Sequence, residues 1–238
     1  FFLRNSDIPQ YVKDGVVDRA IIGENLLIEN QIQLPILQPL GFSKCRLSVA
    51  IPKSSGMSSL QDFQNKKIAT SYPNTVLNFF KSKNIDIEIH EISGSVEIAP
   101  SIGLSDAIVD IVSSGNTLFK NNLKEFQTIL KSEAILVSTP NLDSEKSTIL
   151  KKLQFRIESV LKARKSKYIL MNVPNDKIDL ISTILPVLKS PTVMPLAEKG
   201  WSSVHSVINE DKFWDIIDEL KQAGAEGILV VPIEKMIL

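Results

Sequence analysis

The sequence predicts an α/β protein made of two parts. Over residues 1–165, short apolar runs alternate with segments of helical periodicity, which is typical of an α/β body. After Lys165 the pattern changes to strand, helix, strand, strand, helix, strand, which is the ferredoxin-like order. About seventy residues suffice for a small independent domain. We therefore expect an α/β body followed by a ferredoxin-like domain.

Composition argues against several classes of protein. The 238 residues contain 27 Lys and Arg against 27 Asp and Glu, a balance that favours no nucleic-acid partner. No apolar run approaches the roughly 18 residues that a membrane span needs. Cys45 is the single cysteine, so an intrachain disulfide is excluded, and with two distant histidines it forms no zinc motif. The chain starts at Phe1 without a methionine, which is consistent with a fragment.

The elements of the body follow from local patterns. Strands are expected at residues 20–22, 47–51, 67–70, 85–89, 107–112, 126–130 and 134–137. Leu47, Val49 and Ile51 alternate with more polar residues, which predicts a half-buried strand. Helices are expected at residues 7–15, after Pro73, from Val96 and at about 145–165. Residues 26–41 are interpreted as connection, and the turn-rich loop 52–59 as a candidate lobe boundary.

The helix expected at 145–165 carries one apolar stripe and many basic residues. The stripe includes Leu150, Leu153 and Ile157 at helical spacing. We interpret the basic residues as a solvated face rather than a nucleic-acid patch. In the last domain, strands are expected at residues 168–173, 192–196, 204–208 and 228–231, and helices at 174–188 and 213–223.

The stretch D-A-I-V-D-I-V-S-S-G-N-T-L, from Asp106 to Leu118, is the strongest functional signal. A buried strand at 107–112 runs into the small polar loop Ser113–Thr117 and then a helix start. Gly115 allows close backbone approach, and loop hydroxyls and free N–H groups suit an anion. Asp110 interrupts the apolar run, and a polar ligand or Mg²⁺ at the strand end would account for a buried carboxylate. The alternative is an ordinary turn between strand and helix with a capping hydroxyl and a surface Asp.

Several further strings, in their order and spacing, carry a resemblance to a known family. They are D-I-P at 7–9, D-G-V-V-D at 14–18, I-I-G-E-N at 21–25, C-R-L-S at 45–48, I-A-T-S-Y-P at 68–73, G-S-V-E-I-A-P at 94–100, the stretch at 106–118, S-K-Y at 166–168, S-P-T at 190–192 and P-I-E-K-M at 232–236. Over nearly its full length the chain resembles the long form of ATP phosphoribosyltransferase, the first enzyme of histidine biosynthesis.

The resemblance implies a two-lobed catalytic body similar to type II periplasmic binding proteins. Lobe I would comprise residues 1–53 and 131–165, lobe II residues 54–130, and the histidine-binding regulatory domain residues 166–238. The implied reaction joins ATP and phosphoribosyl pyrophosphate to give phosphoribosyl-ATP and pyrophosphate, with Mg²⁺. Histidine would inhibit, and the enzyme would be a cytoplasmic dimer or hexamer. Members carry a further segment before the position of Phe1, with basic residues near the substrates.

The resemblance also assigns the phosphoribosyl pyrophosphate site. It implies that the 5′-phosphate is held by the loop of Ser113, Ser114, Gly115, Asn116 and Thr117, and that Asp110 contacts the ribose hydroxyls, with Asp106 and Glu97 close by. Glu97 and Asp110 are the candidate catalytic residues. Mg²⁺ would be held mostly by pyrophosphate oxygens, as this ion prefers. Glu97 could instead only favour a helix dipole.

For ATP the resemblance implies Arg4, Gly23, Thr70, Tyr72 and Pro73. Tyr72 could equally be a packed aromatic residue, and Arg4 an ordinary surface charge. His90 and His205 lie on strands and are expected to be exposed or structural rather than catalytic.

For inhibitory histidine the implied contacts are Asn172, Leu188, Ser190, Thr192 and Gly227. Leu188 could instead be a core residue, and residues 190–192 a turn that enters a strand. Two rival functions stay open from the residues alone: a non-catalytic small-molecule binding protein of the same two-lobed fold, and a purely regulatory subunit.

Overall fold

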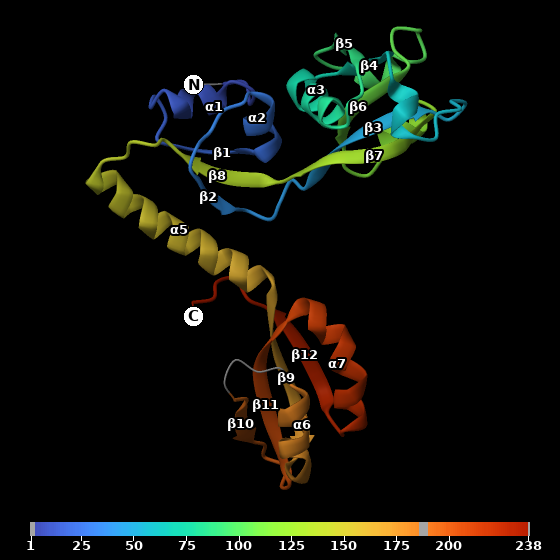
Figure 1. The fold of residues 1–238 in the computed structure, drawn as a ribbon. Coiled ribbons are helices and arrows are strands. Elements are labelled where there is room, and N and C mark those ends of the chain that lie inside the picture. The colour runs from blue at the N-terminus through green and yellow to red at the C-terminus, as the bar shows by residue number, and fades with distance from the viewer. Residues whose placement is uncertain (1–2, 186–189, 238) are drawn as a thin grey trace. The chain divides into compact units, whose positions relative to one another are not determined.

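The computed structural model describes residues 3–185 and 190–237, and the chain divides into two compact units, Phe1–Leu142 and Asp143–Leu238 (Figure 1). In the described residues the first unit holds two sheets and the second unit holds one. The first unit is the expected α/β body. We call its three-stranded sheet with the adjoining helices lobe I, and its five-stranded sheet with the adjoining helices lobe II.

Lobe I is built around the strand order β1-β8-β2. Its elements are α1 (Ile8–Lys13), β1 (Arg19–Gly23), α2 (Glu24–Glu29), β2 (Ile36–Pro39) and β8 (Ala134–Ser138). Val12, Ile22, Leu27 and Val137 are among the buried residues of its core. We expected residues 26–41 to be mainly a connecting segment, and this expectation is wrong. The helix α2 is too short to show a helical period, and β2 is an edge strand, where proline is tolerated.

Lobe II has the strand order β5-β4-β6-β3-β7. These strands are β3 (Cys45–Pro52), β4 (Lys66–Thr70), β5 (Ile87–Glu91), β6 (Ala107–Val112) and β7 (Leu123–Ser132). The strand β6 runs parallel to β4 but antiparallel to β3, so the sheet is mixed. The short helical elements are η1 (Leu60–Phe63), α3 (Pro73–Ser82), η2 (Val96–Ile98) and α4 (Asn116–Lys120).

Both faces of this sheet are covered. Leu47 and Val49 pack with Val76 and Phe80 of α3, whereas Ala50 packs with Leu118 of α4 in a separate cluster. The strand β3 is consequently buried from Leu47 to Ile51, rather than half-buried as its alternation predicted. The second face of the sheet is covered by η2 and α4. Local periodicity could not indicate this cover, because these elements follow later in the sequence.

Strand pairing also moves the lobe boundary. The strand β3 pairs with β6 and β7, so it belongs to lobe II, although we expected residues 1–53 in lobe I. The chain crosses between the lobes at residues 40–44 and again at Glu133, between β7 and β8. The loop 52–59 instead lies within lobe II. Hydrogen bonds between distant strands decide this assignment, and a local pattern does not contain them.

Glu29 connects the two lobes. From the end of α2 its Oε1 accepts a hydrogen bond from the Asn74 amide at 2.9 Å, and its Oε2 accepts from the Thr75 amide at 3.0 Å and the Thr75 hydroxyl at 2.7 Å. A carboxylate from lobe I therefore caps the N-terminus of α3 in lobe II, where the helix dipole favours negative charge. This contact holds the end of α2 against the start of α3, directly after Tyr72.

The second unit has the ferredoxin-like order that the sequence predicts. It comprises α5 (Ser144–Arg164), β9 (Ser166–Pro174), η3 (Asn175–Lys177), α6 (Ile178–Ile184), β10 (Thr192–Pro195), β11 (Trp201–Asn209), α7 (Glu210–Gln222) and β12 (Glu226–Pro232). The antiparallel sheet has the order β10-β11-β9-β12. The helices α6 and α7 bury Ile181 and Leu220 against one face, beside Met171 and Val204.

The long helix α5 belongs to this second unit, although we expected residues 131–165 in lobe I. The Met236 amide donates a hydrogen bond to the Ser159 carbonyl at 3.0 Å, which ties α5 to the C-terminal segment. Of its expected apolar stripe, Leu150 is buried but Leu153 is 44% exposed. Among the helices of the described residues, none combines the length and apolar character that crossing a bilayer requires.

Candidate phosphate-binding site

A small pocket lies at the end of β6, where the sequence predicts an anion site. Its volume is about 100 Å³, and it is lined by Glu97, Asp110, Ile111, Val112, Ser113, Ser114, Gly115, Thr117 and Leu118. Strand, loop and helix start therefore meet as expected, and the pocket is open to a ligand rather than closed inside the core.

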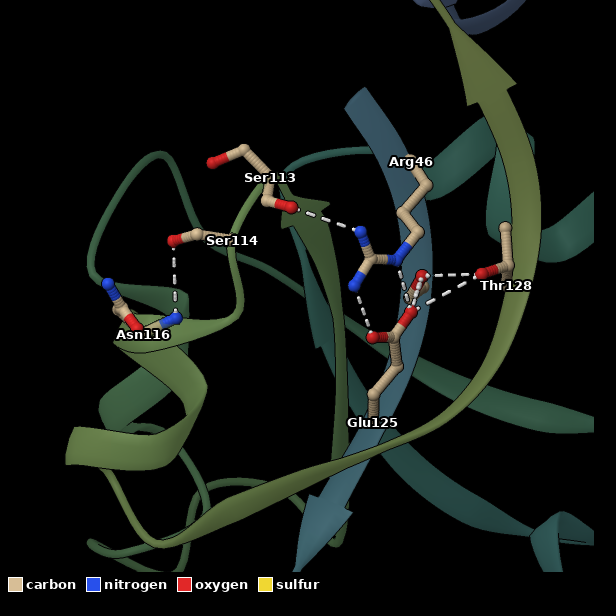
Figure 2. A network of polar contacts seen from close by, with 7 residues as sticks. Arg46, Ser113, Ser114, Asn116, Glu125 and Thr128 are labelled. Carbon is tan, nitrogen blue, oxygen red and sulfur yellow. Dashed lines mark hydrogen bonds and ion pairs between the residues drawn. The ribbon is translucent and has the colours of Figure 1, made fainter. Parts of the chain in front are cut away.

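Gly115 shapes the Ser113–Thr117 loop. Its φ of 81° and ψ of −1° lie in the left-handed region, which glycine adopts without the steric cost that other residues meet. An added Cβ would meet no atom within 4 Å, so the position is constrained by its backbone and not by crowding. The Ser114 hydroxyl accepts a hydrogen bond of 3.5 Å from the Asn116 amide, which closes the turn (Figure 2). Asn116 itself does not line the pocket.

Two carboxylates face this pocket. Burial raises the pKa of Asp110, and the nearby charge of Glu97 raises that pKa further. The Ile111 amide donates to Asp110 Oδ1 at 2.7 Å and opposes this shift. An ionised Asp110 is thus destabilised until a hydroxyl group, a cation or developing positive charge approaches it.

Arg46 supports the loop from the neighbouring strand, and the sequence analysis missed it. Its Nη1 donates to the Ser113 carbonyl at 3.1 Å, while its Nε and Nη2 each donate to one oxygen of Glu125 at 2.6 Å (Figure 2). The only available signal was a single charged residue on a strand whose other residues are uncharged. The partner Glu125 lies on β7, so the pair could not be found without the strand pairing.

The ion pair lowers the pKa of Glu125 to about 2, chiefly through the hydrogen bond from Arg46. Since this pKa is below the usual value of 4.5 in the unfolded chain, the contribution to stability is complete above pH 4.5 and is lost as the pH falls toward 2. We expect the Glu125→Gln variant to show a shallower fall of the unfolding free energy between pH 5 and pH 2 in urea titrations. The exposed Glu91→Gln variant is the control, and an equal slope in the Glu125→Gln and native proteins would contradict the prediction.

A larger pocket of about 500 Å³ adjoins the loop. It is lined by Glu24, Lys44, Cys45, Arg46, Val112, Ser113, Lys131, Ser132 and Glu133. Val112 and Ser113 also line the smaller pocket, so the two spaces share a wall. The larger pocket lies where the chain crosses between the lobes, and it contains both cationic and anionic side chains.

The residues expected at the ATP site fall into different settings. Burial, followed by the charges of Asp110, Cys45 and Glu29, raises the pKa of Tyr72 to about 12, and the half-buried side chain lines neither pocket. The side chain of Thr70 is buried, and its hydroxyl accepts a hydrogen bond from the Tyr72 amide at 2.9 Å. Pro73 is the first residue of α3.

Gly23 has a steric reason for being glycine. An added Cβ would lie 2.4 Å from Oδ1 of Asn25, and that amide is held by the Ser132 hydroxyl, which lines the larger pocket. Arg4 is exposed in the segment before α1 and lines neither pocket.

Asp106 does not join the other expected residues. It lies before the start of β6, whereas the loop follows the end of that strand, roughly 20 Å further along an extended chain. Its carboxylate accepts from the Lys67 amide at 2.9 Å and approaches Lys66 Nζ at 3.9 Å. Asp106 therefore fixes the pairing of β4 with β6 and is withdrawn from the candidate site.

The expected histidine contacts are only partly brought together. Asn172 and Thr192 pair with Ser203 and His205 on β11, and these side chains share the sheet face opposite the α6 and α7 core. Gly227 lies beside Asn172: a Cβ added at Gly227 would be 3.3 Å from Nδ2 of Asn172. Ser190 precedes β10, and Leu188 lies outside the described residues.

Neither histidine has a catalytic setting. His90 contacts Glu88 at 3.1 Å on the outer strand β5, far along the sheet from the loop. His205 lies between the Tyr168 hydroxyl at 2.8 Å and the Ser203 hydroxyl at 2.9 Å in the second unit.

The pocket suits a magnesium ion whose ligands come partly from the protein and partly from a bound substrate. No group of three or more His, Cys, Asp or Glu side chains gathers within residues 3–185 and 190–237. Glu97 and Asp110 offer carboxylate oxygens, and Mg²⁺ in proteins is commonly held by one or two carboxylates together with substrate phosphates. The donor set fits that mode.

Comparison with known proteins shows the family to which the chain belongs. The family model described as ATP phosphoribosyltransferase matches residues 4–159, and the model described as HisG, C-terminal domain, matches residues 163–235. A curated ATP phosphoribosyltransferase from Cytophaga hutchinsonii is 55% identical over 99% of this chain and 82% of its own length. That of Azobacteroides pseudotrichonymphae is 57% identical over 100% of this chain and 84% of its own length.

Solved structures support the same assignment. The ATP phosphoribosyl transferase (HisG:HisZ) complex from Thermotoga maritima is 31% identical over 68% of this chain and 79% of that chain, with a TM-score of 0.61. The periplasmic aliphatic sulphonate binding protein from Escherichia coli, 14% identical over 68% of this chain and 60% of its own, has a TM-score of 0.50 and shows the fold alone.

The fold and the family matches together define a transferase with a two-lobed body of the type II periplasmic-binding-protein kind and a C-terminal ferredoxin-like unit. The chain belongs to the ATP phosphoribosyltransferase family, pentosyltransferases that carry out the first step of histidine biosynthesis. The family resemblance and the fold class expected from the sequence are confirmed.

Proposed function

We propose that the pocket at the end of β6 binds the ribose 5-phosphate part of phosphoribosyl pyrophosphate. The observation that supports this is the meeting of a left-handed glycine loop with Glu97 and Asp110 in one pocket. Hydroxyl and amide groups of the Ser113–Thr117 loop suit the phosphate. The Asp110 carboxylate suits the ribose hydroxyls, because these donate hydrogen bonds to it.

The reaction is a displacement at the anomeric carbon. N1 of adenine forms the new carbon–nitrogen bond, and the bond to the pyrophosphate oxygen breaks, with its electron pair leaving on pyrophosphate. Positive charge develops on the ribose ring, and carboxylates held near it stabilise that charge more than they stabilise the ground state. Glu97 and Asp110 take this role, and positioning of the two substrates supplies the rest.

The larger pocket suits the second substrate and the leaving group. It shares Val112 and Ser113 with the phosphate pocket, and Lys44 and Lys131 provide positive charge for polyphosphate oxygens. Tyr72 is a half-buried aromatic residue directly before α3, and its ring suits adenine stacking. When bound, Mg²⁺ supplies charge neutralisation on pyrophosphate, and the side chains beside that position are Glu97 and Asp110.

The direct test is formation of phosphoribosyl-ATP from both substrates by the purified protein. We expect product and pyrophosphate in equal amounts. Binding of either substrate without turnover would instead favour a non-catalytic binding protein or a regulatory subunit of the same fold.

We also propose that histidine inhibits this cytoplasmic enzyme by binding the outer sheet face around Asn172, Thr192 and Gly227. The Gly227→Ala variant should weaken histidine binding about tenfold, because the added Cβ would push on Asn172 Nδ2 at 3.3 Å. Gly200→Ala is the matched control, since Gly200 also has a positive φ but open space around it. Isothermal titration with histidine measures both, and equal affinities would contradict this site.

A homo-oligomer, dimer or hexamer, is part of the same proposal. Large apolar side chains stand exposed on α5, including Ile149 and Phe155 at 62% and 52% exposure, and such side chains are favoured at subunit contacts. Light scattering on the purified protein measures the assembly state.

A further inference from the structure

The guanidinium of Arg46 joins its own strand to two segments of lobe II that lie 67 and 79 positions further along the chain (Figure 2). Arg46 lies on β3, its partner Glu125 lies on β7, and the Ser113 carbonyl that it binds begins the loop after β6. The strand β3 lies between β6 and β7 in the sheet, so the side chain reaches from the middle strand to both neighbours.

The carboxylate that holds Arg46 is itself fixed. The Ser48 hydroxyl, on a fully buried residue, donates to Glu125 Oε1 at 2.8 Å, and the Thr128 hydroxyl donates to the same oxygen at 3.3 Å. Two parallel bonds from a planar guanidinium to a carboxylate fix the orientation of the guanidinium plane. The third bond, from Nη1 to Ser113, is therefore aimed by the rest of the network.

Holding the Ser113 carbonyl also orients the next amide. In a trans peptide the C=O of one residue and the N–H of the following residue point in opposite directions. The Ser113 carbonyl points at Arg46, so the Ser114 N–H points away from it, and Ser114 lines the smaller pocket. Arg46 thus controls the direction of a donor at the place where a phosphate would bind.

We propose that Arg46 is a positioning residue for the phosphoribosyl site, acting through the Ser113 peptide rather than touching the substrate's 5′-phosphate. This inference rests on the proposed function of the Ser113–Thr117 loop. A lysine keeps the positive charge but cannot make two parallel bonds and a third directed bond together.

The Arg46→Lys variant tests the proposal. We expect the KM for phosphoribosyl pyrophosphate to rise about tenfold or more. The KM for ATP should rise by a smaller factor, because Arg46 also lines the larger pocket. The melting temperature should fall only slightly, because lysine keeps a positive charge beside Glu125. Hydrogen exchange of the amides at 113–117 should become faster in the ligand-free protein, and exchange in β5 should not change. If Arg46 only stabilised the fold, both KM values would change by the same factor, or the melting temperature alone would change. Either result would overturn the proposal.

Loss of charge is tested separately. Arg46→Met should raise the KM for phosphoribosyl pyrophosphate at least as much as Arg46→Lys, whereas Lys124→Met, which removes an exposed charge next to Glu125, should not. Equal effects of the two Met variants would mean general electrostatics and would overturn positioning. Where Arg46 variants fail to fold, Ser48→Ala loosens Glu125 and should raise the same KM by a smaller factor; an unchanged KM there would overturn the proposal.

The Gly115→Val variant separates the two possible failures. If Gly115→Val abolishes binding of phosphoribosyl pyrophosphate and Arg46→Lys leaves it unchanged, the role of Arg46 is wrong and the loop assignment stands. If Gly115→Val binds normally, the loop assignment itself is wrong, and the role of Arg46 is wrong with it.

Discussion

Replacing Asp110 with asparagine is expected to lower kcat about 10²- to 10³-fold, the cost of removing one preorganised charge from a transition state. The substitution keeps the shape of the side chain but removes the negative charge that the proposed site places beside the ribose ring. Because burial and Glu97 raise the pKa of Asp110, its ionised form destabilises the folded protein at neutral pH. The melting temperature of Asp110→Asn should therefore be equal to or higher than that of the native protein.

Asp106→Asn, directly before the start of β6, is the matched control. Asp106 also carries a carboxylate, but it lies at the opposite end of β6 and contacts Lys66 and the Lys67 amide. Asparagine can still accept the amide hydrogen bond, and the exposed ion pair contributes little. Its kcat should stay within about twofold of the native value. A loss of activity as large in Asp106→Asn as in Asp110→Asn would contradict the assignment. Pyrophosphate release measured with both substrates saturating gives kcat for each variant.

Replacing Gly115 with valine is expected to abolish binding of phosphoribosyl pyrophosphate. The backbone at φ 81° is costly for any residue with a Cβ and most costly for a β-branched one. Since the space around Gly115 is open, the side chain itself fits, and the loop responds by changing its backbone. A displacement of such a loop by about 1 Å can lower the activity of an enzyme by two orders of magnitude.

Gly103→Val controls for general strain. Gly103 has a φ of 75° and equally open surroundings, but it lines neither pocket. Both variants should lose similar stability, and only Gly115→Val should lose ligand binding in calorimetric titrations. Retained affinity in Gly115→Val would remove the loop from the site.

Much of the fold was accessible from local patterns because those patterns reflect local physics. The strand and loop from Ala107 to Thr117 were predicted from an apolar run followed by small residues, and the structure places them at a pocket. The ferredoxin-like unit was predicted from the order of its elements. The short helix α2 and the edge strand β2 were missed, because neither is long enough to display a period.

The candidate site was accessible only in part. Asp106 and Asp110 are four positions apart on one extended segment, and no local pattern separates their roles. Their different roles follow from where β6 begins and ends in the sheet. Arg46 and Glu125 are 79 positions apart, and no local pattern relates them.

The sequence by itself determined the family, the order of elements in the ferredoxin-like unit and the loop at the end of β6, since strings of matching residues and hydrophobic periods are properties of neighbouring positions. Only the tertiary structure decided which strands share a sheet, where the lobes divide, and that Arg46 holds the Ser113 peptide. Those features depend on hydrogen bonds between segments that the chain brings together only when it folds.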